Sequence, residues 1–128
     1  MSKKKAYYAH SIRKYNSQEE AEELAFIIRH FKGEVICPNK DLGELGGIEP
    51  YLKVIETTTA VYATEYNNYV GSGVYEECSF ALLKNIPVFV VRKNSNNNFY
   101  VSHLICAKKL KTKTLTYYGE LITAEEKV

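Results

Sequence analysis

The sequence is poor in several features that would quickly assign a protein to a class. Its 128 residues include no tryptophan, one methionine and three cysteines, which are Cys37, Cys78 and Cys106. The cysteines are odd in number and far apart, and no C-x-x-C pair occurs, which argues against a disulfide framework and a zinc site. No group of histidine, cysteine and aspartate has metal-ligand spacing either. We therefore expect no metal, no cofactor and a reducing, cytoplasmic setting.

Net charge and long hydrophobic runs are also scarce. The formal net charge is +2, which is too small to indicate a nucleic-acid partner. No apolar run approaches the roughly 18 residues of a membrane-spanning helix, and no signal peptide is recognisable. The length and the hydrophobic content of 45% are ordinary for a globular protein. We expect a single domain over residues 1–128 and no membrane partner.

The chain does contain a regular alternation of strand-like and helix-like segments. Ser17 is a good N-cap for a helix that Gly33 closes, and Pro50 lies in the first turn of a second helix, where proline is tolerated. Strands are expected over residues 5–12, 34–38, 59–64, 87–91 and 113–118. The second helix is expected over residues 48–58, and further helices over about a dozen residues from Ser72, over 99–110 and in the tail from residue 120. The β-branched residues of segment 99–110 leave a strand open there.

This alternation predicts an α/β fold. Short apolar strands between amphipathic helices are typical of a parallel sheet that is covered on both faces. We expect a three-layer, doubly wound parallel sheet of about five strands, of the flavodoxin or Rossmann kind. Ligands bind such sheets in the crevice at the carboxyl ends of the strands. That rule selects the loops after the strands, which hold His10, Ser11, Arg13, Pro38, Asn39, residues 65–72 and residues from Arg92 onward.

Two adjacent glutamates follow the Gly-Ser-Gly loop of residues 71–73. At about 100° per helical residue, Glu77 lies at the edge of the apolar stripe that contains Val74 and Cys78, and Glu76 lies nearly opposite. The helix dipole stabilises a carboxylate in the first turn by about 0.3–1 kcal/mol, which accounts for Glu76. It does not account for Glu77, because a charge that faces the core costs more than this unless it is paired. Glu77 is therefore a candidate nucleophile or general base.

Four segments, in this order, resemble the nucleoside 2-deoxyribosyltransferase-like superfamily over roughly residues 5–118: YYAHSI, VICPNK, GIEPYLKVIETTTAVYA and SGVYEECSFALLKNIPVFVV. In that family the glutamate of a Gly-(Thr/Val)-x-x-Glu motif attacks the anomeric carbon of a sugar. The residues Gly73, Val74 and Glu77 match the motif, so the resemblance implies the nucleophile's role for Glu77. Family members cleave the N-glycosidic bond of nucleosides and pass the sugar to another base or to water.

One branch, the 2'-deoxynucleoside 5'-phosphate N-hydrolases, is especially similar. Ser11-Ile12-Arg13 matches its Ser-Ile-Arg, which helps to bind the 5'-phosphate. The segment VSHLICA resembles one whose serine, here Ser102, reaches the phosphate across a dimer interface. The family commonly has an aspartate that assists proton transfer; Tyr51 stands at that position, and the nearby Glu49 takes the role if it reaches the crevice. The resemblance implies a homodimer or a larger homo-oligomer.

The sequence thus predicts cleavage or transfer of an N-glycosidic bond on a nucleoside or nucleoside 5'-monophosphate. Glu77 is the predicted nucleophile, and Glu49 or a tyrosine, Tyr8 or Tyr51, assists the leaving base or the water. The predicted substrate-binding residues are Tyr8, His10, Ser11, Arg13, Asn39, Tyr51, Ser72, Gly73 and Ser102. Three alternatives stay open. They are a non-catalytic protein that sequesters or senses a nucleotide, an NAD-cleaving glycohydrolase of the TIR-like architecture, and a flavodoxin-like regulator.

Overall fold

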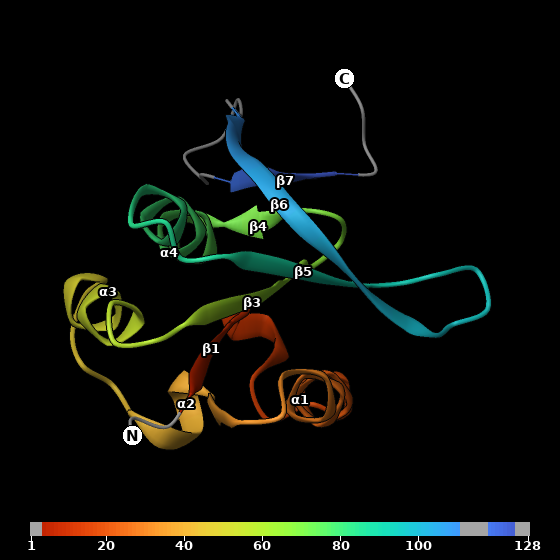
Figure 1. Cartoon of the computed structure of the whole chain (residues 1–128), viewed down its shortest axis with the longest axis horizontal. Coiled ribbons are helices and arrows are strands. Elements are labelled where there is room, and N and C mark those ends of the chain that lie inside the picture. The colour runs from red at the N-terminus through yellow and green to blue at the C-terminus, as the bar shows by residue number, and fades with distance from the viewer. Residues whose placement is uncertain (1–3, 111–117, 125–128) are drawn as a thin grey trace.

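The computed structural model describes residues 4–110 and 118–124, and these form an α/β structure on one mixed sheet (Figure 1). The sheet has seven strands in the order β2-β1-β3-β5-β6-β7-β4. Their bounds are β1 Lys5–Ala9, β2 Glu34–Ile36, β3 Ala60–Thr64, β4 Val70–Gly71, β5 Val88–Lys93, β6 Phe99–Leu110 and β7 Tyr118–Thr123. Strands β2, β1, β3 and β5 pair in parallel, whereas β5 with β6, β6 with β7, and β7 with β4 pair antiparallel. The α/β prediction is confirmed, but an all-parallel sheet of about five strands is not.

Four helices connect the strands: α1 Gln18–Phe31, α2 Pro38–Asp41, α3 Glu49–Ile55 and α4 Ser72–Leu83. A single 3-10 turn, Ile12–Lys14, precedes α1. The side chain of Ser17 accepts a hydrogen bond from the backbone N–H of Glu20, so the predicted N-cap is confirmed. Helix α1 ends at Phe31, two residues before Gly33, because Lys32 and not the predicted Gly33 adopts the left-handed conformation, with φ 59°. Pro50 lies in the first turn of α3, as expected.

The parallel strands have helices on both faces, with α3 and α4 on one side and α1 on the other (Figure 1). Alternate residues of a strand point to opposite faces. Tyr7 therefore packs in the same core as Ile55 of α3 and Cys78 of α4. Tyr8 packs in the second core, with Ile27 of α1. This alternation places Tyr7 and Tyr8 in the cores on opposite faces of the sheet.

The segment 99–110, predicted as a helix, is strand β6. It forms an antiparallel hairpin with β5, in which Phe89 lies opposite His103 and Lys93 opposite Phe99. Asn94 organises the turn, because its side chain accepts hydrogen bonds from the backbone N–H groups of Asn96 and Asn98. The turn signal in residues 94–98 and the β-branched residues after it outweigh the apparent helical spacing.

The C-terminal predictions are also corrected. The expected strand over 113–118 falls almost wholly on residues 111–117, which lie outside the described residues. The expected helix from residue 120 is wrong as far as it is described, because Tyr118–Thr123 is strand β7. Strand β7 pairs with β6 on one side and with the two-residue strand β4 on the other. Strand β4 thus brings the start of α4 to the antiparallel end of the sheet.

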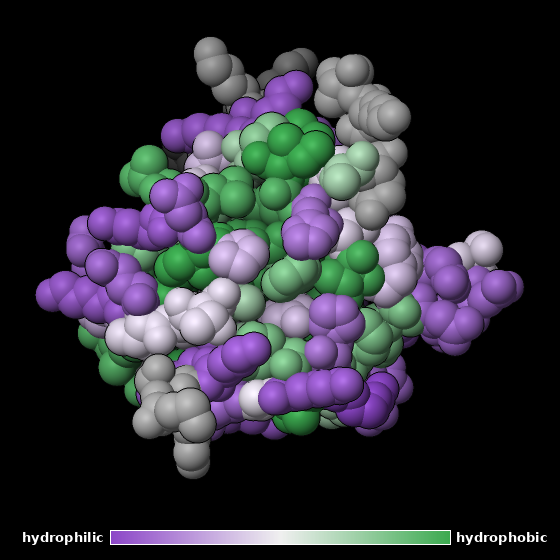
Figure 2. Space-filling view, viewed as in Figure 1, coloured by the Kyte–Doolittle hydropathy of each residue, from purple (hydrophilic) through white to green (hydrophobic). Residues whose placement is uncertain are grey.

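Figure 2 shows hydrophobic side chains in the middle and upper part of the face. In the same view of Figure 1 this region is occupied by α4 and β6. The polar loop between β5 and β6 protrudes at the right of the same view. Among the residues described, no helix has both the length and the apolar character needed to cross a membrane.

Candidate functional site

The candidate site is a cavity of about 1330 Å³ beside the carboxyl ends of β1 and β2. Its walls come from the loop after β1, from the segment between β2 and α3, and from the first half of α4. The chain passes from β1 to β2 on one side and then returns to β3 on the other side of β1. The order of the strands therefore reverses at β1. Ligand crevices of parallel α/β sheets form at such a switch point. The loops selected from the sequence after β1 and β2 therefore meet in one cavity.

Glu77 lies in the wall of this cavity and is only 7% exposed. The neighbouring Glu76 is exposed, which confirms the orientation expected from the helical spacing. Burial raises the pKa of Glu77 to about 7, although a hydrogen bond from the Tyr7 hydroxyl acts in the opposite direction. Near neutral pH the carboxyl group is therefore present in both protonation states.

Tyr7 is the partner that the sequence analysis did not select. Its hydroxyl donates to Oε2 of Glu77 from strand β1, at the base of the cavity. Burial first, and then the neighbouring Glu77, raise the pKa of Tyr7, which keeps the phenol protonated and able to donate. Tyr8, the predicted substrate-binding residue, points to the other face and donates to Glu23 Oε1 at 2.5 Å. The structure does not bring Tyr8 into the cavity.

Most of the other predicted residues line the same cavity as Glu77; they are His10, Ser11, Arg13, Asn39, Tyr51, Ser72 and Gly73. Ser11 caps the 3-10 turn, since its Oγ accepts from the backbone N–H of Arg13 at 3.1 Å. The exposed Arg13 side chain lies over the ring of Tyr66, with its guanidinium carbon 5.6 Å from the ring centroid. Ser11 and Arg13 thus bring a hydroxyl group and a positive charge to the wall of the cavity.

Tyr51 holds the loop that forms one side of the cavity. Its hydroxyl donates to the carbonyl of Gly43 at 2.8 Å and accepts from the N–H of Leu45 at 3.2 Å. The loop turns at Gly43, Gly46 and Gly47, all with positive φ, a backbone conformation that side-chain-bearing residues rarely adopt. Tyr51 therefore acts on the shape of the cavity as well as lining it.

The first turn of α4 also faces the cavity, through Ser72, Gly73 and Val74. The helix is capped by Gly71, which has no side chain to accept a hydrogen bond from the first N–H groups. A Cβ atom at Gly73 would meet no heavy atom within 4 Å, so the backbone there is open. A helix N-terminus of this kind attracts negatively charged groups.

Besides Tyr8, two more predicted residues lie outside the cavity lining. Glu49 is exposed in the first turn of α3 and does not line the cavity. Ser102 is buried in β6 opposite Val90, with an exposed fraction of 1%, and its Oγ has no hydrogen-bond partner among the residues described. Its hydroxyl faces the interior, so it does not point toward a partner subunit. Their predicted roles in proton transfer and phosphate binding are not supported by these positions.

Tyr15 is a cavity residue that sequence reasoning missed. Burial, and then the nearby Glu77 and Tyr51, raise the pKa of its hydroxyl. The side chains of Tyr7, Tyr15 and Tyr51 thus line the same cavity as Glu77. The abundance of tyrosine was visible in the sequence, but no local spacing indicated which of them would gather here.

A second hollow of about 710 Å³ opens on the α1 side of the sheet. Several of its charged groups are paired with oppositely charged residues. Arg92 forms a bidentate ion pair with Glu65, with distances of 2.8 and 3.1 Å, and it also donates to the carbonyl of Leu121. Buried Lys14 lies 2.8 Å from Oε2 of Glu23. Because these charged side chains are paired with one another, the hollow has less charge available to a ligand than the cavity around Glu77.

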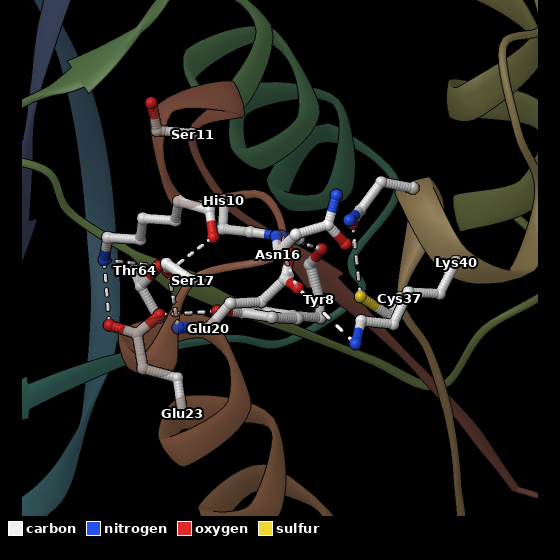
Figure 3. A network of polar contacts seen from close by, with 12 residues as sticks. Tyr8, His10, Ser11, Asn16, Ser17, Glu20, Glu23, Cys37, Lys40 and Thr64 are labelled. Carbon is white, nitrogen blue, oxygen red and sulfur yellow. Dashed lines mark hydrogen bonds and ion pairs between the residues drawn. The ribbon is translucent and has the colours of Figure 1, made fainter.

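A buried polar network borders the Glu77 cavity at the start of α1 (Figure 3). The Nε2 atom of His10 lies 2.7 Å from Oε2 of Glu20, and both side chains are buried. Burial alone would raise the pKa of Glu20, but hydrogen bonds from His10, from the Asn16 backbone and from Asn39 lower it overall. Burial raises the pKa of Cys37 to about 11. One candidate ligand atom each from His10, Glu20 and Cys37 lies within 4.8 Å of the other two.

Comparisons of this chain with protein-family models, with curated proteins and with solved structures find no significant match.

Proposed function

We propose that the cavity binds a nucleoside or a nucleoside 5'-monophosphate and that Glu77 cleaves its N-glycosidic bond. The observation that carries the proposal is a carboxyl group, 7% exposed, in the wall of a large cavity, with a pKa raised to about 7. A buried carboxylate with a shifted pKa in a cleft is characteristic of functional sites. The volume of about 1330 Å³ exceeds the roughly 300–1,000 Å³ of typical ligand pockets, which leaves room for a nucleotide and an acceptor.

The proposed reaction follows the logic of a retaining glycosidase. The ionised Glu77 attacks C1' of the sugar, the bond from C1' to the base nitrogen breaks, and its electron pair leaves with the base. Water or a second base then attacks C1' and releases Glu77 as a carboxylate. The hydrogen bond from Tyr7 orients the carboxyl group toward the cavity and favours its ionised form.

The departing base needs a proton, and a tyrosine is the best placed donor. Glu49 is exposed and outside the cavity lining, and Tyr8 is bonded to Glu23 on the opposite face. Tyr15 and Tyr51 both line the cavity, and Tyr51 contributes to the raised pKa of the Tyr15 hydroxyl. Since Tyr51 is engaged with the backbone of Gly43, Tyr15 is the freer of the two for this step.

The proposed phosphate position lies between Arg13, Ser11 and the first turn of α4. Arginine offers a planar set of donors that fits phosphate oxygens, and the helix N-terminus adds backbone N–H groups. The exposed position of Arg13 gives a charged substrate group access to solvent at the cavity mouth while C1' reaches Glu77. A nucleoside 5'-monophosphate fits such a site, because it has a phosphate for Arg13 and a C1' atom for Glu77.

The resemblance to the nucleoside 2-deoxyribosyltransferase-like superfamily belongs to this proposal. So does a doubly wound, flavodoxin-like arrangement of the parallel strands β2, β1, β3 and β5 with helices on both faces. A cytoplasmic location is supported by the three cysteines, which are free thiols. A homodimer remains an expectation from the family resemblance alone.

A second candidate is a binding protein that retains a nucleotide without cleaving it. The exposed position of Glu49 favours it, because the predicted second carboxylate does not line the cavity, where Glu44 of the loop before α3 is the other acidic residue beside Glu77. The buried Glu77 would in that case accept a hydrogen bond from a ribose hydroxyl instead of attacking C1'.

The test incubates the purified protein with nucleosides, their 5'-monophosphates and NAD, and chromatography measures the free base. We expect base release from a nucleoside or its monophosphate by the wild type and by Glu76→Gln, the matched control, since Glu76 is exposed. We expect no release by Glu77→Gln. Tight retention of one nucleotide without release by any of the proteins supports the binding alternative and rejects catalysis. Release of nicotinamide from NAD alone indicates an NAD glycohydrolase.

A further inference from the structure

We propose that His10, Glu20 and Cys37 form a binding site for one zinc ion at the wall of the cavity. Their imidazole nitrogen, carboxylate oxygen and thiol sulfur lie within 4.8 Å of one another, and all three residues are buried. Nitrogen, oxygen and sulfur ligands together suit zinc, a borderline-soft cation. The proposal concerns residues of the α1 side and does not depend on the reaction proposed for Glu77.

The three ligands come from three separate parts of the fold. His10 follows β1, Glu20 lies in the first turn of α1, and Cys37 follows β2. Figure 3 shows their side chains converging between these elements. Because the sequence separations are long, no local motif reveals the group, which explains why the sequence predicted no metal site. A cation here would fasten the ends of two neighbouring parallel strands to the start of α1.

The orientation of His10 is the first independent observation. Its Nδ1 lies 3.2 Å from the carbonyl of Tyr8 and therefore donates to it, since a carbonyl oxygen has no hydrogen. The ring also stacks on Tyr8 at a centroid distance of 3.8 Å with an angle of 5° between the planes. Histidine ligands of metals almost always donate their second ring N–H to a carbonyl or carboxylate in this manner.

The contact between His10 and Glu20 is the second observation. With Nδ1 donating to Tyr8, Nε2 of a neutral ring presents a lone pair to Oε2 of Glu20, only 2.7 Å away. Two lone pairs repel one another, so a positive centre must lie between these atoms. A proton satisfies the pair in the metal-free protein, and a divalent cation bound to both atoms replaces it.

Charge balance completes the argument. A zinc ion with two positive charges is neutralised by the carboxylate of Glu20 and the thiolate of Cys37, while His10 binds as a neutral imidazole. A neutral cluster avoids the high cost of a net charge in a buried place. On binding, the thiol proton and the proton shared by His10 and Glu20 leave to solvent, and no redox change is involved.

The surroundings already hold the ligands and provide access. Oε1 of Glu20 accepts from the backbone N–H of Asn16 at 3.1 Å, which directs Oε2 toward His10. The thiol of Cys37 donates to Oδ1 of Asn39 at 3.3 Å. Both His10 and Asn39 line the cavity, so a cation and its fourth ligand, water or the Asn39 oxygen, are reached from that side. This pattern of three protein ligands with one open position is that of reactive zinc sites.

Lys40 is a cation that lies beside the carboxylate of Glu20. Its Nζ lies 3.7 Å from Oε1 of Glu20, but its side chain is 47% exposed and free to turn toward solvent. One charge pair at about 4 Å in water is worth about a fivefold change in affinity. Because the two protons that leave offset the two positive charges of zinc, we expect Lys40→Met to change zinc affinity by less than about fivefold.

The experiment titrates the full-length protein with Co²⁺, a spectroscopic substitute for zinc, in a reductant that does not bind metals. We expect one equivalent to produce a thiolate-to-cobalt charge-transfer band together with visible bands of tetrahedral cobalt, and we expect zinc to displace it. The band should vanish in Cys37→Ser and persist in Cys106→Ser, the matched control, because Cys106 is an exposed free thiol on β6. His10→Gln should weaken zinc binding by more than about 100-fold, beyond the loss expected for a supporting residue.

The wild-type spectrum alone decides the proposal if the variants do not fold. Absence of a thiolate band at one equivalent of Co²⁺ overturns it, as does binding of several equivalents without that band. A band that survives Cys37→Ser but is lost in Cys106→Ser places the metal elsewhere and also overturns it. An increase in the melting temperature of the wild type with zinc, absent in Cys37→Ser, supports the site by a readout other than activity.

Discussion

Replacing Glu77 by glutamine should stabilise the protein, and the gain should depend on pH. The native state keeps the proton on Glu77 up to about pH 7, whereas an unfolded chain releases it near the ordinary value of 4.5. The native state therefore binds more protons than the unfolded state between these two pH values. Stability of the wild type falls as the pH rises through this window, and the cost of burying the charge is fully present above pH 7.

The size of the effect follows from the shift in pKa. A rise from 4.5 to about 7 corresponds to about 3 kcal/mol of unfolding free energy at pH 8. Only about 1 kcal/mol of it applies at pH 5, because this pH lies just above the unfolded pKa of 4.5 and ionisation stabilises the unfolded chain little there. Glutamine is neutral at every pH and still accepts the hydrogen bond from Tyr7. The difference in stability between Glu77→Gln and wild type should therefore grow by about 2 kcal/mol from pH 5 to pH 8.

The assay is urea unfolding of wild type, Glu77→Gln and Glu76→Gln at several pH values between 5 and 8.5. Comparing the change with pH removes any constant effect of the amide group itself. A gain of about 3 kcal/mol corresponds to roughly 10 °C in melting temperature for a chain of this length. Glu76→Gln, on the exposed side of α4, should follow the wild type at every pH. Parallel curves for Glu77→Gln and wild type would refute the argument that burial holds a proton on Glu77.

Three further substitutions test other contacts. Tyr7→Phe removes the hydrogen bond that favours the ionised Glu77, so the fall in stability should extend to higher pH by about one unit in the same urea experiment. Lys14→Met leaves Glu23 buried without its cation and should cost about 3–5 kcal/mol at neutral pH, measured by urea unfolding. In Gly119→Ala the new Cβ would lie 2.6 Å from an aromatic ring and 3.0 Å from a backbone carbonyl, so we expect a melting temperature lower by several degrees, from about 1–3 kcal/mol of overpacking. A melting temperature unchanged in Gly119→Ala would mean that the ring moves aside freely.

The orientation of Glu77 was predictable because it depends on helix geometry alone. Each residue turns the chain by about 100°, so a residue three positions after Val74 faces the same side of α4. The N-cap at Ser17 and the early proline of α3 were predictable for the same reason, since each depends on contacts within a few residues. The carboxyl-end rule likewise selected the loops that supply most of the cavity lining.

The segment 99–110 could not be assigned from its own residues. Its apolar positions fit a helix and a strand, and the decision depends on β5, which offers hydrogen bonds along its edge. The hairpin buries Ser102 and Leu104 on one face and leaves His103 and Ile105 exposed. A serine that the family resemblance places at a phosphate is in this way turned into the interior of the sheet.

The sequence by itself determined where α1 and α3 begin and that Glu77 faces inward from α4, but it did not determine that segment 99–110 is a strand. Only the tertiary structure decided that Tyr7, and not Tyr8, meets Glu77, because adjacent residues of a strand face opposite sides and the packing of the helices defines those sides. It also decided that His10, Glu20 and Cys37 meet. Helical and strand periodicity depends on neighbouring residues. Contacts of this kind depend instead on how distant elements pack, which local sequence spacing does not encode.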